Sequence, residues 1–346
     1  MKILWTVVLL LGISLMTKGD VAVAPGSIRV QNVFDSANLV CSCLVESLDD
    51  QKSATETAGK PSTHHEVTAT VAIQDVYKSD DPGVKKVFIR YAQDEQQGQT
   101  VGGSRLRLSK SQNVLLFLTK TGTDTYEFAD PFLGATQFSS LPIASGDQGL
   151  LKLQRVLSAV VQQAPGIEQL RALQILQGFD HIADDTLSVV RPLSESSDPD
   201  IALTALGVFL KTKSTDSVLT LKRYFDSHRS DTQRVALFVI GPELSEITNP
   251  KALPALEALS TSKFLPIQFG AMDAIRRIRN VNSTPTLIQR LDDSNSTVRY
   301  VAVITLAEIY GKYEGDYAPS MYLFDKKPQY YTALWKTWWV ERGGKP

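Results

Sequence analysis

Four short groups of side chains have the residue types and spacing that ligand binding or catalysis requires. They are Cys41 with Cys43, the run His64-His65-Glu66, the run Arg276-Arg277-Ile278-Arg279, and the C-terminal aromatic residues Tyr331, Trp335, Trp338 and Trp339. No GxSxG, Walker A, GxGxxG or EF-hand pattern occurs in the 346 residues. The sequence therefore predicts no catalytic residues, no cofactor and no metal site, and we expect that the protein is not an enzyme.

The pair Cys41 and Cys43 admits three interpretations. On a strand, side chains two residues apart lie on the same face, so both thiols could fill a core as small apolar groups. They could instead form a disulfide or an oxidisable pair, which would be strained because side chains two apart on a strand point in parallel. Metal binding is the third interpretation, although the sequence places no partner ligands nearby. Because the chain has two Cys in all, a disulfide scaffold is excluded.

Two charged groups have simpler interpretations. His64-His65-Glu66 lies in a polar segment without HExxH spacing, so it predicts a solvated turn rather than a metal site. Arg276-Arg277-Ile278-Arg279 ends a predicted helix, where the helix dipole stabilises positive charge. An anion-binding patch is the alternative for these arginines.

The C-terminal aromatic residues fall on one helical stripe. Tyr331, Trp335, Trp338 and Trp339 share a face of a helix predicted to begin near Pro328. One interpretation is a capping helix that covers the open end of a helical stack. The other is a stacking platform for a sugar or a peptide.

Charge and length limit the class of protein. With 36 basic and 37 acidic side chains the formal net charge is −1, which argues against a nucleic-acid partner. The length of 346 residues predicts two domains.

The first residues are typical of a secretory signal peptide. Lys2 precedes the uncharged stretch Ile3 to Met16, which is shorter than the roughly 20 residues of a membrane-spanning helix. We expect residues 1–24 to be the signal, cut between 19 and 24; an uncleaved anchor is the alternative. No later segment is long and apolar enough to cross a membrane, so the pattern predicts an exported protein, periplasmic or extracellular.

Residues 28–145 alternate between apolar and polar side chains, which predicts five or so strands. Val67, Ala69, Val71 and Ile73 illustrate this period of two. The polar segment from Asp49 to Thr63 predicts a long exposed loop, and Asp80-Asp81-Pro82-Gly83 and Gly102-Gly103 predict turns. So many short strands favour a small barrel or a sandwich.

The strand order resembles that of the netrin-like, tissue-inhibitor-of-metalloproteinase-like OB barrels. The segments concerned are Ala37–Val40, Val67–Lys78, Lys86–Tyr91 and Val114–Leu118. The resemblance implies an OB-like β-barrel and, as an alternative function, metalloprotease inhibition. In those inhibitors a Cys-x-Cys opens the mature chain and chelates zinc. Here residues 20–40 or 25–40 would precede Cys41 after cleavage, so the chain departs from that pattern.

Residues 150–346 repeat with a helical period after a predicted linker at Ser145–Gly149. An alanine followed four residues later by an aliphatic residue recurs at Ala172, Ala202, Ala236, Ala271 and Ala302. The spacings of 30, 34, 35 and 31 residues predict stacked helical hairpins. A small side chain allows neighbouring helices to approach closely. Second helices are predicted at 184–194, 215–227, 249–260 and 284–292.

The segment Leu291–Leu306, with its Asp-rich turn before Val298-Arg299 and Ala302, resembles HEAT repeats. The resemblance implies that Asp292 or Asp293 and Arg299 brace the turn, and that binding follows the face built by the second helices. The predicted fold is therefore an all-β, OB-like small barrel followed by an all-α, HEAT-like solenoid with an aromatic cap. We expect an exported, non-enzymatic protein-binding or scaffold protein. Its partner would be a protein or peptide, with a carbohydrate possible.

Overall fold

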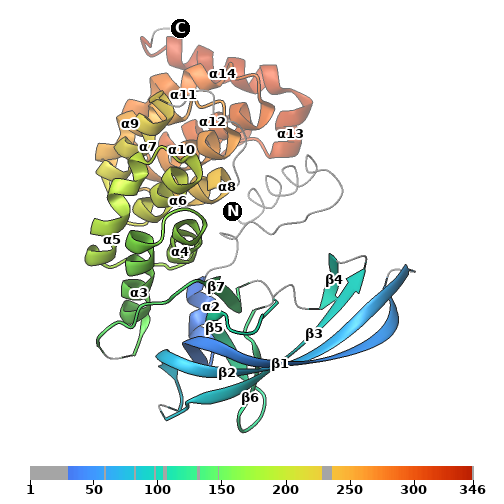
Figure 1. The fold of residues 1–346 in the computed structure, drawn as a ribbon. Helices are drawn as coiled ribbons and strands as arrows, with labels where there is room; N and C mark the ends of the chain where they lie inside the picture. The colour runs from blue at the N-terminus through green and yellow to red at the C-terminus, as the bar shows by residue number, and fades with distance from the viewer. Residues whose placement is uncertain are drawn as a thin grey trace.

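The computed structural model describes residues 30–344 apart from 58–59, 82, 97–98, 104–106, 131–132, 147 and 228–235. An N-terminal β-sheet region is followed by a C-terminal helical region, with the helices stacked side by side (Figure 1). The predicted signal peptide at residues 1–24 lies outside the described residues.

The β-sheet region begins with a short helix and continues with a seven-stranded sheet. Its elements are α2 (Val30–Ser36), β1 (Leu39–Thr57), β2 (Lys60–Ser79), β3 (Lys86–Gln96), β4 (Gln99–Gly103), β5 (Asn113–Lys120), β6 (Thr125–Phe128) and β7 (Ala135–Phe138). Strand β1 pairs with β2 and β5, β2 pairs with β3, and β5 pairs with β6, all antiparallel. Strands β3 and β6 pair in parallel, so the path of pairings returns to β1. β4 pairs with β3, and β7 pairs with β5, both antiparallel.

The predicted loop from Asp49 to Thr63 is wrong. Strands β1 and β2 continue as a long hairpin, with register pairs from Asp49 opposite Thr68 to Thr57 opposite Lys60. Polar Ser, Thr, Gln and charged side chains occupy both faces of this arm, so the alternation that identifies a half-buried strand is missing. Gly102-Gly103 likewise ends strand β4 instead of forming a turn.

One face of β1 is apolar and fully buried. Leu39, Cys41, Cys43 and Val45 have no exposed surface and pack against apolar side chains of β2, β3 and β5. On the opposite face Ser42 is also buried, with 1% of its surface exposed. Both faces of this end of β1 are therefore covered, one by the sheet and one by helices.

A second core joins the β-sheet region to the helices. Leu115 and Phe117 of β5 pack in one cluster with Phe34 of α2 and with Leu153 and Leu157 of α3 (Leu150–Gln163). The predicted linker therefore connects two regions that bury apolar side chains against each other.

The helical region continues from α3 as pairs of helices in two layers. Its elements are α4 (Ile167–Gln177), α5 (Asp184–Val190), η2 (Arg191–Glu195), α6 (Pro199–Leu210), α7 (Thr215–Ser227), α8 (Ala236–Ser245), η3 (Pro250–Ala252), α9 (Leu253–Leu259), α10 (Leu265–Ile278), η4 (Val281–Ser283), α11 (Thr284–Arg290), α12 (Ser296–Ile309), η5 (Gly315–Tyr317), α13 (Met321–Lys326) and α14 (Pro328–Val340). The first helices α4, α6, α8, α10 and α12 contact one another in sequence. The second helices α5, α7, α9 and α11 cover one side of this layer.

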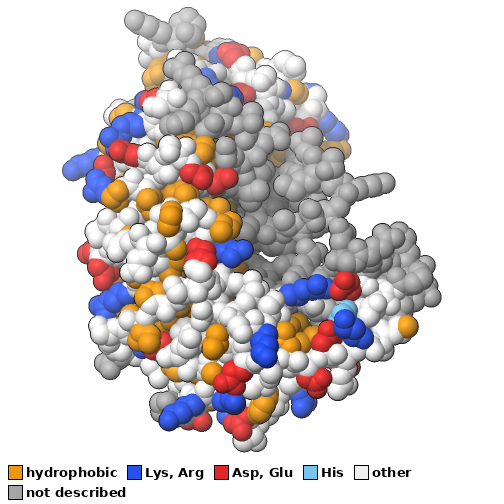
Figure 2. All heavy atoms as spheres, viewed as in Figure 1, with side chains coloured by type: hydrophobic (Ala, Val, Ile, Leu, Met, Phe, Trp, Pro, Cys, Tyr) orange, Lys and Arg blue, Asp and Glu red, His pale blue; other side chains and the backbone are white. Residues whose placement is uncertain are grey.

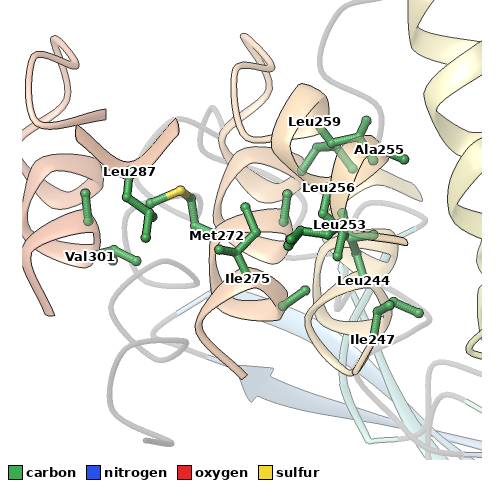
Figure 3. Close-up of a cluster of buried hydrophobic side chains, with 14 of the residues drawn as sticks. Leu244, Ile247, Leu253, Ala255, Leu256, Leu259, Met272, Ile275, Leu287 and Val301 are labelled. Carbon is green, nitrogen blue, oxygen red and sulfur yellow. The ribbon is translucent and has the colours of Figure 1, made fainter. Parts of the chain in front are cut away.

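Four of the five repeated alanines are buried in the helical region, as predicted; the side chain of Ala236 lies outside the described part of the structure. Ala172, Ala202, Ala271 and Ala302 have no exposed surface. Leu244, Leu256 and Met272, from three consecutive helices, fill the space around these contacts (Figure 3). A small side chain at each crossing is what allows larger ones beside it to interdigitate.

Candidate interaction surface

Charged side chains at the C-terminal ends of the first helices form a row of ion pairs, which we name the charged ridge. Its members are Lys211, Lys213, Glu243, Glu246, Asp273, Arg276, Arg277, Arg279 and Glu308. The ridge starts just after α6, where Lys211 Nζ lies 2.9 Å from Glu243 Oε1 of α8. The pairs made by Glu243, Glu246 and Glu308 join neighbouring repeats, whereas Asp273 pairs with Arg276 and Arg277 of its own helix.

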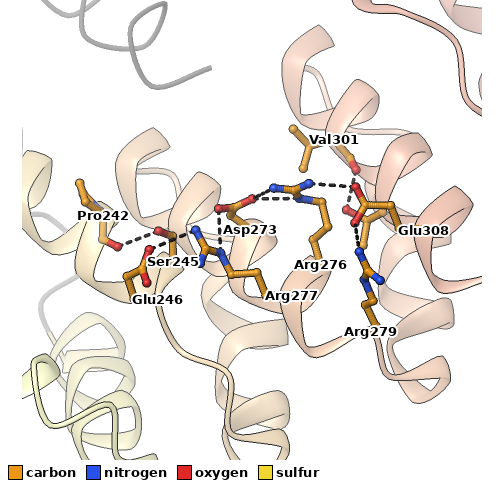
Figure 4. Close-up of polar contacts among 10 residues, drawn as sticks. Pro242, Ser245, Glu246, Asp273, Arg276, Arg277, Arg279, Val301 and Glu308 are labelled. Atoms are coloured by element: carbon orange, nitrogen blue, oxygen red, sulfur yellow. Dashed lines mark hydrogen bonds and ion pairs between the residues drawn. The ribbon is translucent and has the colours of Figure 1, made fainter. Parts of the chain in front are cut away.

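Arg276 and Arg277 of α10 hold the centre of the charged ridge (Figure 4). Arg277 Nη2 lies 3.1 Å from Glu246 Oε1 of the preceding repeat. Arg276 makes two contacts, 2.6 Å to Asp273 Oδ1 and 2.9 Å to Glu308 Oε1 of the following repeat. Both arginines lie in the last turn of α10, as the helix-dipole interpretation predicts.

Arg279 ends α10 in a left-handed conformation, with φ of 53°. This conformation is usually taken by Gly or Asn at a helix C-terminus. Here the backbone N–H of Arg279 donates to Ile275 O, and its guanidinium lies 3.4 Å from Glu308 Oε2. With Arg276 and Arg277 it borders a shallow pocket of about 290 Å³.

The charged groups of the charged ridge are paired with one another. Burial disfavours the charged form of Arg276, but its hydrogen bonds and attraction to Asp273 and Glu308 outweigh this, so the pKa of its guanidinium is raised. The pocket itself has three arginines and one glutamate, all paired within the ridge. The three arginines therefore offer less unpaired positive charge to an anion than the sequence alone suggests, which weakens the interpretation as an anion-binding patch.

The second helices expose a different surface, which we name the second-helix face. It consists of Leu219, Arg223, Pro254, Ala258, Pro285 and Gln289, each exposed. Leu219, Pro254 and Pro285 are separated by 35 and 31 residues, as are Arg223, Ala258 and Gln289, and these are the spacings of the repeat itself. The six residues therefore occupy equivalent positions in consecutive repeats and include one charge.

Figure 2 shows the mixed character of the helical surface, with hydrophobic side chains between scattered charged ones. Leu219 is 44% exposed. Exposed Asp226 and Lys251 lie next to the six residues, so apolar side chains such as Leu219 stand among charges, as they do in the polar rim and apolar centre of a protein interface.

The turn before α12 has the bracing that the HEAT resemblance implies. Arg299 Nη1 donates to the carbonyl oxygens of Asp293 and Ser294, at 2.7 and 3.0 Å. Asp293 in turn accepts from the Asn295 backbone N–H at 2.9 Å and from Gln268 Nε2 at 2.9 Å. Asp293 therefore ties its own turn to α10.

The β-sheet region contains an open groove of about 680 Å³ across β1, β2, β3 and β6. Its charged lining residues are Asp49, Glu66, Arg90 and Glu127, with Tyr91 and Phe128 beside them. The rings of Tyr91 and Phe128 lie 5.1 Å apart at a tilt of 42°. This groove lies on a different part of the molecule from the second-helix face.

Cys41 and Cys43 are free thiols with no exposed surface, and their sulfurs lie 3.0 Å apart. Burial raises the pKa of the Cys43 thiol well above its ordinary value. Within the described part of the chain, no group of three or more His, Cys, Asp or Glu is arranged to hold a metal. Both thiols point into the core, so they offer no ligand to a zinc ion on another protein.

The predicted turn at His64-His65-Glu66 is wrong, because these residues belong to strand β2. His65 is 8% exposed, and its Nδ1 lies 2.9 Å from Asp50 Oδ1 of β1. His64 Nδ1 lies 2.7 Å from Asp94 Oδ1 of β3. Cross-strand carboxylates on both neighbours thus hold the two imidazoles in the hairpin arm. Because polar residues again lie on both faces of the strand, the sequence here lacks the alternation of apolar and polar residues that predicts a strand.

The aromatic stripe lies on α14, which begins at Pro328 as predicted. Tyr331, Trp335 and Trp338 are 6%, 0% and 5% exposed and belong to the core of the helical region. Trp335 Nε1 donates to Tyr317 O at 3.1 Å. Of the four predicted binding residues, Trp339 alone is partly exposed, so a ligand would meet one indole.

Sequence reasoning missed the acidic members of the charged ridge. The distance in sequence from the repeated alanine of a helix to its ridge residue varies. It is nine residues for Lys211, seven for Glu243, five for Arg276 and six for Glu308. Because these offsets differ, no periodic pattern marks the ridge, and only the stacking of helices brings its members together.

Residues 218–307 match the family model of HEAT repeats. HEAT repeats are protein-interaction modules, so the match indicates a protein-interaction or scaffold role for the helical region. No curated protein matches the chain. Among the described residues, no helix has both the length and the apolar character needed to cross a membrane.

Proposed function

We propose that this protein is an exported, non-enzymatic scaffold that binds another protein through its helical region. One observation carries the proposal: residues 218–307 match HEAT repeats, and the helices around them stack in two layers. Stacked hairpins leave a long flank of the second helices open to solvent. An extended flank suits a protein or an extended peptide better than a small molecule.

The second-helix face is the favoured contact surface. Its residues recur at the repeat spacing and include the exposed apolar side chain of Leu219. The charged ridge is less suitable, since its charges are already paired and a partner would have to replace those contacts.

For the β-sheet region we propose an OB-like barrel that supplies a second contact. The return of the strand pairings to β1 supports this, together with the parallel pair β3 and β6. The groove lined by Asp49, Glu66, Arg90 and Glu127 is the contact surface that this region offers.

Export rests on the charge and hydropathy pattern of residues 1–24. Cell fractionation followed by N-terminal sequencing of the mature chain tests it. We expect the protein in the exported fraction, starting between residues 20 and 25. A chain that retains residue 1 in the cytoplasm would contradict export while leaving the scaffold proposal open.

Binding is tested by cross-linking the full-length protein to partners in the exported fraction and identifying them by mass spectrometry. Leu219→Glu places a charge on the second-helix face and should abolish the cross-links. Leu151→Glu, at a position 58% exposed on α3, is the matched control and should retain them. Equal cross-linking by both variants would exclude this face as the contact.

A further inference from the structure

The two sulfur atoms on β1 are unusually close. Cys41 Sγ and Cys43 Sγ lie 3.0 Å apart, although a regular strand holds side chains two residues apart in parallel. A disulfide bond measures about 2.05 Å, so the sulfurs are about 1 Å from bonding distance. Both residues have no exposed surface and face the same core.

The pairing of β1 with β2 is irregular at the two cysteines. The register between β1 and β2 shifts between Val40 and Cys41 and again between Ser42 and Cys43. The pairing skips Tyr77 and Gln74 of β2 at these two points. The extra residues lie on β2, so β2 is the bulged strand, whereas β1 pairs with β5 without a register shift. Bulges increase the local twist of the pair, and both cysteines lie at this twisted part of the β1–β2 pairing.

The surroundings favour a bond between the two sulfurs over other uses of the pair. The neighbouring core residues are apolar, among them Leu39, Val71 and Leu116. In the chain as far as it is described, no third His, Cys, Asp or Glu completes a metal site with the thiols. A metal ion would therefore have two ligands, too few for a tetrahedral site.

We propose that Cys41 and Cys43 form an intrachain disulfide, made while the chain folds. The Cys43 thiol is disfavoured as a thiolate once buried, and thiolates are the attacking species in disulfide exchange. The bond therefore forms before the core closes. It does not depend on scaffold binding; in the cell it requires an oxidising compartment, which the proposed export supplies.

The chemistry balances with an external disulfide, such as glutathione disulfide, as the oxidant. One cysteine thiolate attacks a glutathione sulfur, forms a mixed disulfide and releases one glutathione thiolate. The other cysteine thiolate then attacks the chain's sulfur in that mixed disulfide and releases the second glutathione thiolate, which takes up a proton. Two cysteine thiols are oxidised, and one glutathione disulfide is reduced to two glutathiones.

The ring contains one intervening residue, Ser42, so it constrains the unfolded chain little. Its main effect is to remove two reactive thiols, rather than to hold distant segments together. We therefore expect the oxidised and reduced proteins to have similar melting temperatures.

The test unfolds the full-length protein under reducing conditions and refolds it in a glutathione and glutathione disulfide buffer. The sample is then quenched in acid, denatured and treated with N-ethylmaleimide, and its intact mass is measured. We expect a chain two hydrogen atoms lighter than the dithiol, with no maleimide adduct. After reduction the same sample should take two adducts. Two adducts without reduction, or a glutathione adduct on the folded chain, would overturn the proposal.

Single variants and the timing of oxidation complete the test. Cys41→Ser and Cys43→Ser each leave one thiol, which should take one maleimide or carry one glutathione; because alkylation is done in denaturant, this result does not need the variants to fold. The folded, reduced wild-type protein should oxidise at least tenfold more slowly than the protein in urea. Equal rates would contradict formation before the core closes.

Discussion

Glu257 on α9 shows how burial at one residue sets a pH dependence. Its Oε1 atom is buried without a hydrogen-bond partner, and burial raises the pKa of its carboxyl. A group whose pKa is higher in the folded state stabilises the fold fully below its unfolded pKa, and this stabilisation is lost as pH rises through the folded pKa.

Glu257→Gln should therefore be more stable than the wild type at pH 7. The difference should shrink as pH falls through the raised pKa of the folded carboxyl, and it should be gone below about 4.3, the ordinary pKa of Glu, because the carboxyl is then protonated in both states. Urea unfolding at a series of pH values measures it. Glu314→Gln, at an exposed position, is the matched control and should show no such trend. A variant less stable than wild type at pH 7 would contradict the assignment.

Gly270 on α10 lies directly against the backbone of α8. A Cβ atom there would lie 2.3 Å from the carbonyl oxygen of Gly241 on α8. Gly→Ala inside a helix normally gains roughly 0.5–1 kcal/mol. Here the clash is with backbone, which cannot rotate away, so overpacking should prevail.

Gly270→Ala should lower the free energy of unfolding by about 1–3 kcal/mol. Urea denaturation followed by far-UV circular dichroism measures the change. Leu265→Ala on the same helix is the control, since Leu265 is 42% exposed, and it should change stability by less than about 0.5 kcal/mol. A stabilised Gly270→Ala protein would refute the close contact.

At the scale of the helix, the question is whether α14 closes the stack or offers a platform. Trp335 has no exposed surface and packs near Tyr310, Tyr317 and Trp338, with ring centroids 6.4, 5.0 and 5.2 Å away. Aromatic pairs at such distances add stability beyond the area they bury. The geometry favours the cap.

Trp335→Ala should reduce the free energy of unfolding by about 3–5 kcal/mol because it leaves a cavity in the core. Trp339→Ala, at the partly exposed position, should cost clearly less. A chain that stops at Gly315 should lose the folded signal of the last repeats. Thermal unfolding by circular dichroism compares the three proteins. A truncated chain with unchanged helical signal would instead favour the platform.

The elements also show where sequence reasoning works. The repeated alanines, such as Ala271 and Ala302, were predictable because close helix packing tolerates few residue types at the crossing. The hairpin arm from Asp49 to Thr63 was not, because a strand with polar side chains on both faces has no hydropathy period. The charged ridge was not predictable for a third reason. Its ion pairs arise from the stacking of whole helices and not from local spacing in the sequence.

Over the whole molecule, the β-sheet region and the helices behave as one packing unit. Besides the shared apolar core, Ser139 of the β-sheet region donates from its backbone N–H and its hydroxyl to Glu168 of α4, at 2.7 and 2.9 Å. Lys152 Nζ of α3 lies 2.5 Å from Asp75 Oδ1 of β2, and both side chains are about 10% exposed or less. A buried ion pair spans the junction between the two regions.

Removing one member of that pair leaves the other charge buried alone. Lys152→Met should therefore cost about 3–5 kcal/mol, whereas the double change Asp75→Leu with Lys152→Met should cost much less, because no unpaired charge remains. Arg155→Met on the same helix is the control. Arg155 lies 3.4 Å from its partner Asp185, and both side chains are more than half exposed. Its loss should lower the free energy of unfolding by at most about 1 kcal/mol. Urea unfolding of the wild type, Lys152→Met, Asp75→Leu and the double variant forms a double-mutant cycle, and Arg155→Met is measured beside it. A double variant as unstable as Lys152→Met would mean that the pair's packing, and not its charge, holds the two regions together.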